Sequence, residues 1–263
     1  MIKNNKNNFS EELEIAMSAA KQAGEFISQS FRTDFKTKKK SDGSVVTECD
    51  VASDNLIRKL LAEVTPYPIF SEEIEGNKLE GTSWVVDPLD GTSNFVKGIP
   101  FFSVSIALFI DGLPRLGVVF NPIVNDMFSA VSGGGAYLNN QRIEVSSQDS
   151  LRGASVCLGG GRSQEAKLLF NKVFNKIAEI AGVKKLGSNA LECCYVASGA
   201  FDLFISPESE IYDHGAAMTI VQEAGGALTD WSGENITNKN LRSRIIASNS
   251  RVYSQALDLL GSI

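Results

Sequence analysis

The sequence predicts a layered α/β protein with two lobes. In the first lobe, the apolar runs 102–110, 116–120 and 127–131 are separated by the turn sequences Asp111-Gly112 and Asn121-Pro122. Short strands joined by such turns are typical of a meander, so a large antiparallel sheet is expected there. In the second half of the chain, strand-like runs alternate with amphipathic helical segments, which indicates a second α/β layer.

The other elements follow from hydrophobic periodicity and from helix start signals. Ser10 is the expected N-cap of a first long helix, and Thr47 with Asp50 forms a near capping box that opens a second helix. In the second half, the expected strands are 155–158, 183–186, 201–205, 227–229 and 245–247, and the expected helices are 163–181, 188–198, 213–223 and a last one near 256–260.

Length and charge exclude several classes of protein. The 263 residues suffice for two fused lobes, and the polar stretch 145–150 suggests a boundary between lobes 1–146 and 147–263. The net charge is −6, so neither direct nucleic-acid binding nor membrane binding is expected. No apolar run reaches membrane length and the N-terminus lacks a signal-peptide pattern, so we expect a cytoplasmic protein with reduced cysteines.

The single histidine, the four cysteines and the lysines limit which reactions the protein could catalyse. His214 is the single histidine, which excludes reactions that need two of them. The four cysteines show no metal-ligand spacing. The basic cluster Lys36, Lys38, Lys39 and Lys40 is expected to be a solvated loop, of which one member could face an anionic substrate.

The stretch 84–95 carries the clearest functional signal. A short apolar strand ends at Asp87, and Asp90 follows three residues later in a turn. Two carboxylates in one small volume would repel each other, and a hard divalent cation such as Mg²⁺ relieves that repulsion. The Leu89 carbonyl lies between the acids and could supply another oxygen, while Thr92 could hold a water. The alternative is an Asp-rich turn that only caps a strand.

Two residues shape this turn. Pro88 has no N–H to donate, so we expect the strand ladder to end there. Gly91 permits positive φ and a close approach of the backbone to a ligand.

Three further acids could join the same site. Glu72 and Glu73 end the short strand 69–70, so two neighbouring strand ends could supply one site, although surface charge is the alternative. Asp50 stands in the first turn of the second helix, where it could cap the helix or serve the site.

Two short motifs resemble those of other phosphatases without matching them. Cys157 to Arg162 resembles the phosphate loop of tyrosine phosphatases, but four residues rather than five separate the cysteine from the arginine. We therefore interpret this stretch as a loop at a helix N-terminus that could still meet an anion. Asp87 and Asp90 are also spaced differently from the Asp-x-Asp pair of haloacid dehalogenases.

Taken together, the acidic motifs resemble those of the inositol monophosphatase superfamily of Mg²⁺-dependent, lithium-sensitive phosphatases. Four motifs carry the resemblance in the family's order: Val46–Asp50, Ser71–Glu73, Asp87–Phe95 and Tyr212–Gly226. The resemblance implies an α-β-α-β-α sandwich with a large antiparallel sheet and a second mixed sheet. It also implies a homodimer.

The resemblance assigns roles to individual residues. The implied metal ligands are Glu72, Asp87, the Leu89 carbonyl, Asp90 and Asp213. The implied catalytic residues are Asp50, Glu72 and Thr92, with Asp50 and Thr92 similar to the pair that activates water. The implied substrate-binding residues are Asp90, Gly91, Thr92, Gly187, Ser188, Asn189 and Asp213. The implied mechanism is in-line attack by a water that Mg²⁺ activates, without a phosphorylated enzyme.

The substrate is less well defined. Asn189 stands where the family has a small alanine, and Ser206 stands where it has a substrate-binding glutamate, with Glu208 and Glu210 nearby. The implied function is hydrolysis of a small-molecule phosphate monoester, with inositol monophosphate as the first candidate. Histidinol phosphate, fructose 1,6-bisphosphate, adenosine 3′,5′-bisphosphate and NADP are the alternatives, as is a non-catalytic role in transcription or ribosome assembly.

Overall fold

The computed structural model describes residues 9–40, 43–74 and 78–263 of the chain. Its helices are α1 (Ser10–Ser30), α2 (Glu48–Val64), α3 (Thr92–Val96), α4 (Gln164–Ile177), α5 (Asn189–Ala197), α6 (Ile211–Glu223) and α7 (Tyr253–Gly261). Within this described part of the chain, none of the helices combines the length and the apolar character needed to cross a membrane.

The larger sheet has seven strands and contains the predicted meander. In spatial order its strands are β3 (Ile69–Ser71), β4 (Ser83–Asp90), β5 (Ser103–Ile110), β6 (Leu113–Asn121), β7 (Asp126–Val131), β8 (Gly135–Leu138) and β9 (Gln141–Ile143). The strands from β4 to β9 are antiparallel to their neighbours, whereas β3 at the edge pairs in parallel with β4.

The smaller sheet is mixed, as predicted. In spatial order its strands are β11 (Gly182–Lys184), β10 (Ser155–Leu158), β12 (Leu203–Glu210), β14 (Arg242–Asn249) and β13 (Gly226–Asp230). The strand β10 is parallel to both of its neighbours, whereas β14 is antiparallel to both β12 and β13.

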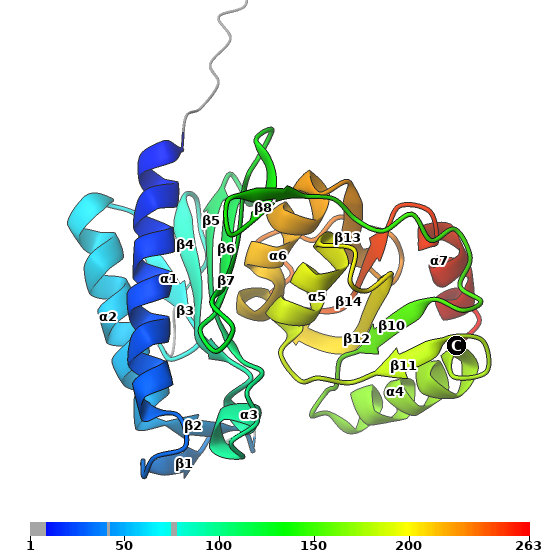
Figure 1. Cartoon of the computed structure of the whole chain (residues 1–263), viewed down its shortest axis with the longest axis horizontal. Coiled ribbons are helices and arrows are strands. Elements are labelled where there is room, and N and C mark those ends of the chain that lie inside the picture. Colours follow the sequence, from blue (N-terminus) through cyan, green and yellow to red (C-terminus); the bar gives the residue numbers. More distant parts are fainter. Residues whose placement is uncertain (1–8, 41–42, 75–77) are drawn as a thin grey trace, which may run out of the picture.

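These elements stack in five layers (Figure 1). The helices α1 and α2 cover the outer face of the larger sheet, and α5 and α6 lie between the two sheets. The helices α4 and α7 lie on the far side of the smaller sheet. The predicted α-β-α-β-α sandwich is therefore confirmed.

The central position of α6 depends on one close contact with the larger sheet. A Cβ at Gly117 in β6 would lie 2.1 Å from the carbonyl oxygen of Ala216 in α6. Only a glycine permits that approach, because any other side chain would overlap the helix backbone. Since α6 carries Asp213, this contact also sets the distance between Asp213 and the acids at the end of β4.

Two local predictions at the N-terminal side were wrong. The N-cap of α1 is Phe9, and Ser10 is the first helical residue, with no cap hydrogen bond from the side chain of the N-cap. The lysine stretch forms an exposed strand, β1 (Thr37–Lys39), because it pairs with β2 (Val45–Thr47) in a small antiparallel sheet. Periodicity over three residues is too short to reveal such a pairing.

The prediction that the ladder ends at Pro88 was also wrong. The pairing of β4 with β5 is interrupted after Asp87 and resumes at Asp90, which pairs with Ser103. The chain bulges at Pro88 and Leu89, and the Pro88 carbonyl accepts a hydrogen bond from the Ser53 hydroxyl at 2.9 Å. The bulge changes the alternation of side chains, so that Asp87 and Asp90 reach one site.

Candidate active site

The predicted site residues surround one cleft of about 760 Å³. The residues of that prediction that line the cleft are Glu72, Asp87, Leu89, Asp90, Gly91, Thr92, Gly187, Asn189 and Asp213. Asp50 and Ser188 are buried behind the lining, where they contact Thr92 and Asp90 respectively. The structure thus brings together residues from β4, α2, α3, α5 and α6 and from the turn that follows β3.

Three aspartates form the acidic centre of the cleft. Asp87 and Asp90 come from β4, Asp213 comes from the first turn of α6, and one carboxylate oxygen of each lies within 4.8 Å of the others. Burial, together with the charges of Glu72, Asp90 and Asp213, raises the pKa of Asp87 well above its ordinary value. Burial and the charges of Asp90 and Glu72 raise the pKa of Asp213 in the same way.

Asp90 is held by hydrogen bonds from the start of α5 and from β5. Its Oδ2 atom accepts hydrogen bonds from the Ser188 hydroxyl at 2.5 Å and from the Ala190 N–H at 2.9 Å, and the Ser103 hydroxyl lies at 3.4 Å. Burial nevertheless raises the pKa of Asp90 to about 6 against these bonds. Ser188, predicted to bind substrate, is itself fully buried and orients this carboxylate.

Asp213 is oriented by the start of its own helix. The helix begins at Ile211, two residues earlier than expected, and the Asp213 carboxylate accepts the Glu210 N–H at 2.9 Å in a capping box. The Asn189 amide donates to the same oxygen at 3.3 Å. Asn189 therefore contacts an acid of the centre as well as lining the cleft.

The acidic centre fits a hard divalent cation. Its donors are all carboxylate oxygens, which Mg²⁺ prefers, and both burial and the repulsion between neighbouring carboxylates raise the pKa values of Asp87 and Asp213. A cation between them would relieve that repulsion. Leu89, whose carbonyl belongs to the predicted ligand set, also lines the cleft.

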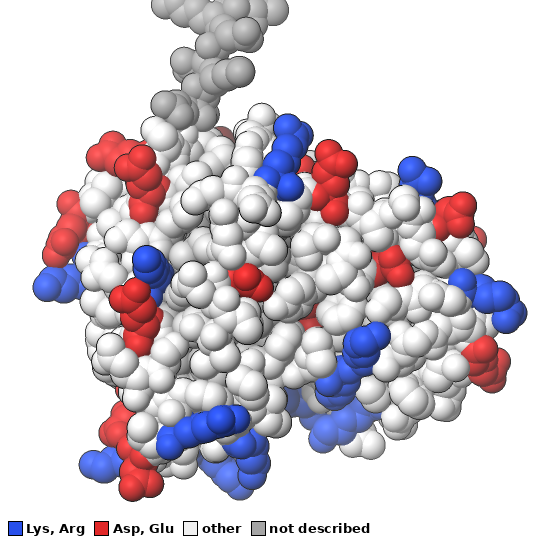
Figure 2. Space-filling model, viewed as in Figure 1, with Lys and Arg blue, Asp and Glu red and all other residues white. Residues whose placement is uncertain are grey.

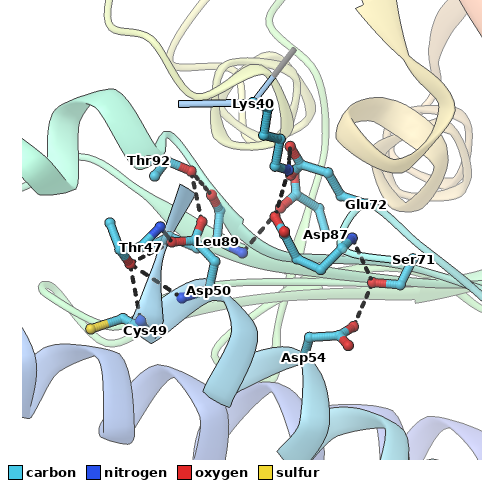
Figure 3. Close-up of polar contacts among 11 residues, drawn as sticks. Lys40, Thr47, Cys49, Asp50, Asp54, Ser71, Glu72, Asp87, Leu89 and Thr92 are labelled. Carbon is cyan, nitrogen blue, oxygen red and sulfur yellow. Dashed lines mark hydrogen bonds and ion pairs between the residues drawn. The ribbon is translucent and has the colours of Figure 1, made fainter. Parts of the chain in front are cut away.

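Glu72 faces the same cleft but is held by a lysine. The Lys40 ammonium lies 3.0 Å from Glu72 Oε1 and 2.8 Å from Glu73 Oε1 (Figure 3). The two carboxylates raise the pKa of Lys40 although burial alone would lower it. One member of the lysine cluster thus does reach the site.

Asp50 combines the two roles that its position allowed. Its Oδ2 atom accepts the N–H and the hydroxyl of Thr47, which completes the capping box of α2. Its Oδ1 atom lies 2.9 Å from the Thr92 hydroxyl, which is also 3.0 Å from the Leu89 carbonyl (Figure 3). One carboxylate oxygen of Asp50 caps the helix and the other contacts Thr92 at the site, so the capping role and the functional role are compatible.

The backbone around Gly91 is tightly packed. Gly91 has φ of +94°, and a Cβ there would lie 3.1 Å from the Phe101 carbonyl and 3.2 Å from the Gly187 carbonyl. The Asn94 amide donates to the carbonyls of Phe101 and Leu186, both at 2.7 Å. These contacts join α3 to the segment before α5, so that both halves of the chain close the cleft.

Sequence reasoning missed Glu192, a buried acid behind the cleft. The Oε1 atom of Glu192 in α5 accepts the Leu186 N–H at 2.8 Å, the Gly187 N–H at 3.3 Å and the Cys157 thiol at 3.0 Å. Burial raises the pKa of Glu192 to about 7, against these hydrogen bonds. A lone charged residue in the apolar stretch 190–197 was the available signal. Glu192 fixes the segment that carries Gly187 into the cleft.

His214 takes no direct part in the acidic centre. It is fully buried, and its Nδ1 atom lies 3.0 Å from the Ser209 hydroxyl. Burial lowers the pKa of His214 to about 3, so the ring is neutral at ordinary pH.

The family that the chain matches supports the interpretation of this cleft as an active site. The model of the inositol monophosphatase family matches residues 8–261. The chain belongs to the inositol monophosphatase family. The resemblance inferred from the four sequence motifs is thereby confirmed.

Two groups of relatives appear within that family. The chain is 40% identical to Nus factor SuhB of Pasteurella multocida over 84% of this chain and 85% of that protein. It is 34% identical to inositol-1-monophosphatase of Rhizobium meliloti over 84% of this chain and 86% of that protein.

Solved structures show the same fold. The extragenic suppressor protein suhB of Bartonella henselae has a TM-score of 0.88 at 30% identity, covering 95% of this chain and 98% of that one. The IMPase of Thermotoga maritima has a TM-score of 0.87 at 30% identity, covering 96% and 97%.

Proposed function

We propose that this protein is a Mg²⁺-dependent phosphomonoesterase that acts on a small phosphorylated metabolite. The observation that carries the proposal is the convergence of Asp87, Asp90 and Asp213 beside the hydrogen-bonded pair Thr92 and Asp50. A purely structural cation site would have no use for that pair. Family membership supports the same reaction class.

In this proposal, Mg²⁺ would be held by the carboxylates of Glu72, Asp87, Asp90 and Asp213 and by the Leu89 carbonyl. When bound, it would supply Lewis-acid polarisation of the phosphoryl group and lower the pKa of the attacking water. In this proposal the Glu72 carboxylate would serve both the cation and Lys40, which lies 3.0 Å from its Oε1 atom.

The remaining chemistry falls to Thr92 and Asp50. The Thr92 hydroxyl donates its proton toward Asp50, which leaves an oxygen lone pair to accept a hydrogen bond from a water in the cleft. Burial raises the pKa of Asp50, which makes this carboxylate a better proton acceptor. Gly91, with its positive φ, lets the backbone lie close to the transferred phosphate.

Inositol monophosphate is the first substrate to test, because relatives of this chain are named inositol monophosphatases. The experiment is a phosphate-release screen over inositol, histidinol, fructose, adenosine and NADP phosphates with Mg²⁺, with and without Li⁺. We expect release that requires Mg²⁺ and falls with Li⁺. Absence of release from every compound would contradict the proposal.

A second candidate function comes from the SuhB relatives, which are named Nus factors. Under it, the chain would bind the transcription or ribosome-assembly machinery without catalysis. An affinity capture from the source cell should compare the wild type with Asp90→Asn. Equal capture of RNA polymerase or ribosomal components by both would favour this role, independently of phosphatase activity.

Three further expectations are part of the proposal. They are a homodimer, a cytoplasmic location and a division into lobes 1–146 and 147–263. Size-exclusion chromatography with light scattering tests the first, and fractionation of the source cell tests the second. Limited proteolysis near residues 145–150 tests the third.

A further inference from the structure

His214 is a buried polar residue that the proposed reaction does not use directly. The charged side chains visible in Figure 2 lie on the molecular surface, whereas His214 is fully buried in α6, between the two sheets (Figure 1). It directly follows Asp213 and is the single histidine of the sequence. In the described part of the chain, its Nε2 atom has no hydrogen-bond partner. The contacts of Nδ1 therefore determine what the ring does.

Ser209 connects this ring to the acidic centre. Its hydroxyl oxygen lies 3.0 Å from His214 Nδ1 and 3.4 Å from Asp213 Oδ2. The Asn189 amide lies 3.2 Å from the same hydroxyl and 3.3 Å from Asp213 Oδ2. Since a serine hydroxyl has one hydrogen, Ser209 can donate it either to the ring or to the carboxylate. The position of the hydrogen on the ring decides between the two.

The surroundings of the ring place its hydrogen on Nδ1. Burial lowers the pKa of His214 to about 3, and a hydrogen bond with the backbone of Glu210 opposes this effect. The carbonyl of Glu210 is the group that can do so, because it accepts from the ring, whereas the N–H of Glu210 donates to Asp213. A neutral ring carries one N–H, and Nε2 has no acceptor among the described residues, so the hydrogen belongs on Nδ1.

With the hydrogen on Nδ1, the groups around Ser209 have matching roles. The ring and the Asn189 amide both donate to the hydroxyl oxygen, and the hydrogen of Ser209 is directed to Asp213 Oδ2. The opposite tautomer would accept the serine hydrogen and turn a lone pair of the hydroxyl toward the carboxylate. A buried carboxylate is held less well when it loses a donor in this way.

We propose that His214 is a positioning residue, whose Nδ1–H tautomer directs the Ser209 hydroxyl to Asp213 and so fixes this carboxylate for the divalent cation. The inference rests on the cation site of the proposed function. It gives the histidine no contact with the cation or the substrate. Groups that orient a metal ligand typically change metal affinity by about tenfold or more.

The first test measures the tautomer itself by NMR. Because His214 is the single histidine, untagged protein that contains isotope-labelled histidine gives ring nitrogen signals from this residue alone. We expect the hydrogen on Nδ1 in chelator-treated protein, and a shift of the ring signals when Mg²⁺ is added. A hydrogen on Nε2, or ring signals that do not respond to saturating Mg²⁺, would overturn the inference.

The second test asks whether His214 acts through Ser209. His214→Phe keeps a ring but removes the donor, and Ser209→Ala removes the hydroxyl. Each should lower Mg²⁺ affinity about tenfold in calorimetry, and the double variant should lose about tenfold rather than about a hundredfold. His214→Asn, whose amide can donate from the position of Nδ1, should stay within about twofold of the wild type. Losses that multiply in the double variant would overturn the inference.

Thr219→Val is the matched control. Thr219 is another buried polar residue of α6, and its hydroxyl has no partner within the described ranges, so this variant should keep the wild-type Mg²⁺ affinity. An equal loss in Thr219→Val would show that α6 responds to any such change, and would also overturn the inference. None of these measurements needs a substrate. If they agree with the inference but no compound releases phosphate, the phosphatase function fails and the positioning role stands.

Discussion

The Thr92 hydroxyl lies 2.9 Å from Asp50 Oδ1, although the two residues stand 42 positions apart in the chain. Asp50 comes from the first turn of α2, and Thr92 is the first residue of α3. The contact joins the helix layer to the end of β4, where the acidic centre lies. It gives the site a hydroxyl with two acceptors within hydrogen-bond distance, Asp50 Oδ1 and the Leu89 carbonyl at 3.0 Å.

This relationship predicts a specific loss of turnover. Thr92→Val keeps the side-chain shape but removes the hydroxyl, so kcat for the best substrate should fall by about 10²-fold or more, with little change in Mg²⁺ affinity. Steady-state kinetics and Mg²⁺ titration calorimetry measure both quantities. Thr33→Val, at an exposed hydroxyl after α1, should behave as the wild type. Wild-type kcat in Thr92→Val would contradict the role of the pair.

Ser188 should affect the metal more than the chemical step. Ser188→Ala removes the hydroxyl that holds Asp90 at 2.5 Å, so the carboxylate loses part of its orientation. Loss of such a supporting contact typically weakens metal affinity by about tenfold or more. Calorimetric Mg²⁺ titration is the measurement, and Ser198→Ala, at the other end of α5, is the control. Unchanged Mg²⁺ affinity in Ser188→Ala would show that the hydroxyl is dispensable.

Glu192 should make stability depend on pH. Burial raises its pKa in the folded protein to about 7, above the ordinary value of 4.5, so the folded state binds this proton more tightly than the unfolded state. The resulting stabilisation is fully present below the ordinary pKa and is lost as the pH rises through the folded pKa.

Glutamine at this position cannot titrate. Between about pH 5 and about pH 8, the free energy of unfolding of Glu192→Gln should therefore fall less than that of the wild type, by about 2 kcal/mol. Urea denaturation in chelator measures the difference, and Glu179→Gln on the surface is the control. Parallel pH curves for the wild type and Glu192→Gln would contradict the raised pKa.

The contact between β6 and α6 should tolerate no side chain. Gly117→Ala places a Cβ 2.1 Å from the Ala216 carbonyl oxygen, so the helix must move or the fold must loosen. We expect a loss of about 3 kcal/mol in the free energy of unfolding. Gly261→Ala, where a Cβ would meet nothing within 4 Å, should cost far less. Equal stability of the two variants would show that the layers adjust freely.

Much of the fold could be predicted because its elements are locally encoded. The helix α2 begins where Thr47 and Asp50 form their capping box, and the meander follows from hairpin turns between apolar runs. The bulge at Pro88 could not be predicted, because the resumed pairing of Asp90 with Ser103 depends on β5. The sequence rule for proline considers only its missing N–H and contains no information about the neighbouring strand.

The candidate site divides in the same way. Asp87, Asp90 and Thr92 could be named because one short motif contains them. Two other contacts of the site could not be predicted, those between Lys40 and Glu72 and between Ser188 and Asp90. They join residues that are 32 and 98 positions apart, so no local sequence pattern indicates them.

The central claim is that the three aspartates hold a catalytic Mg²⁺. Its most direct test is phosphate release from the best substrate as Mg²⁺ is added to chelator-treated protein, in the wild type, Asp90→Asn and the surface control Asp258→Asn. We predict no release in chelator, saturable recovery with Mg²⁺ in the wild type and Asp258→Asn, and a loss of about 10³-fold in folded Asp90→Asn. Full activity in excess chelator, or wild-type activity in Asp90→Asn, would contradict the claim.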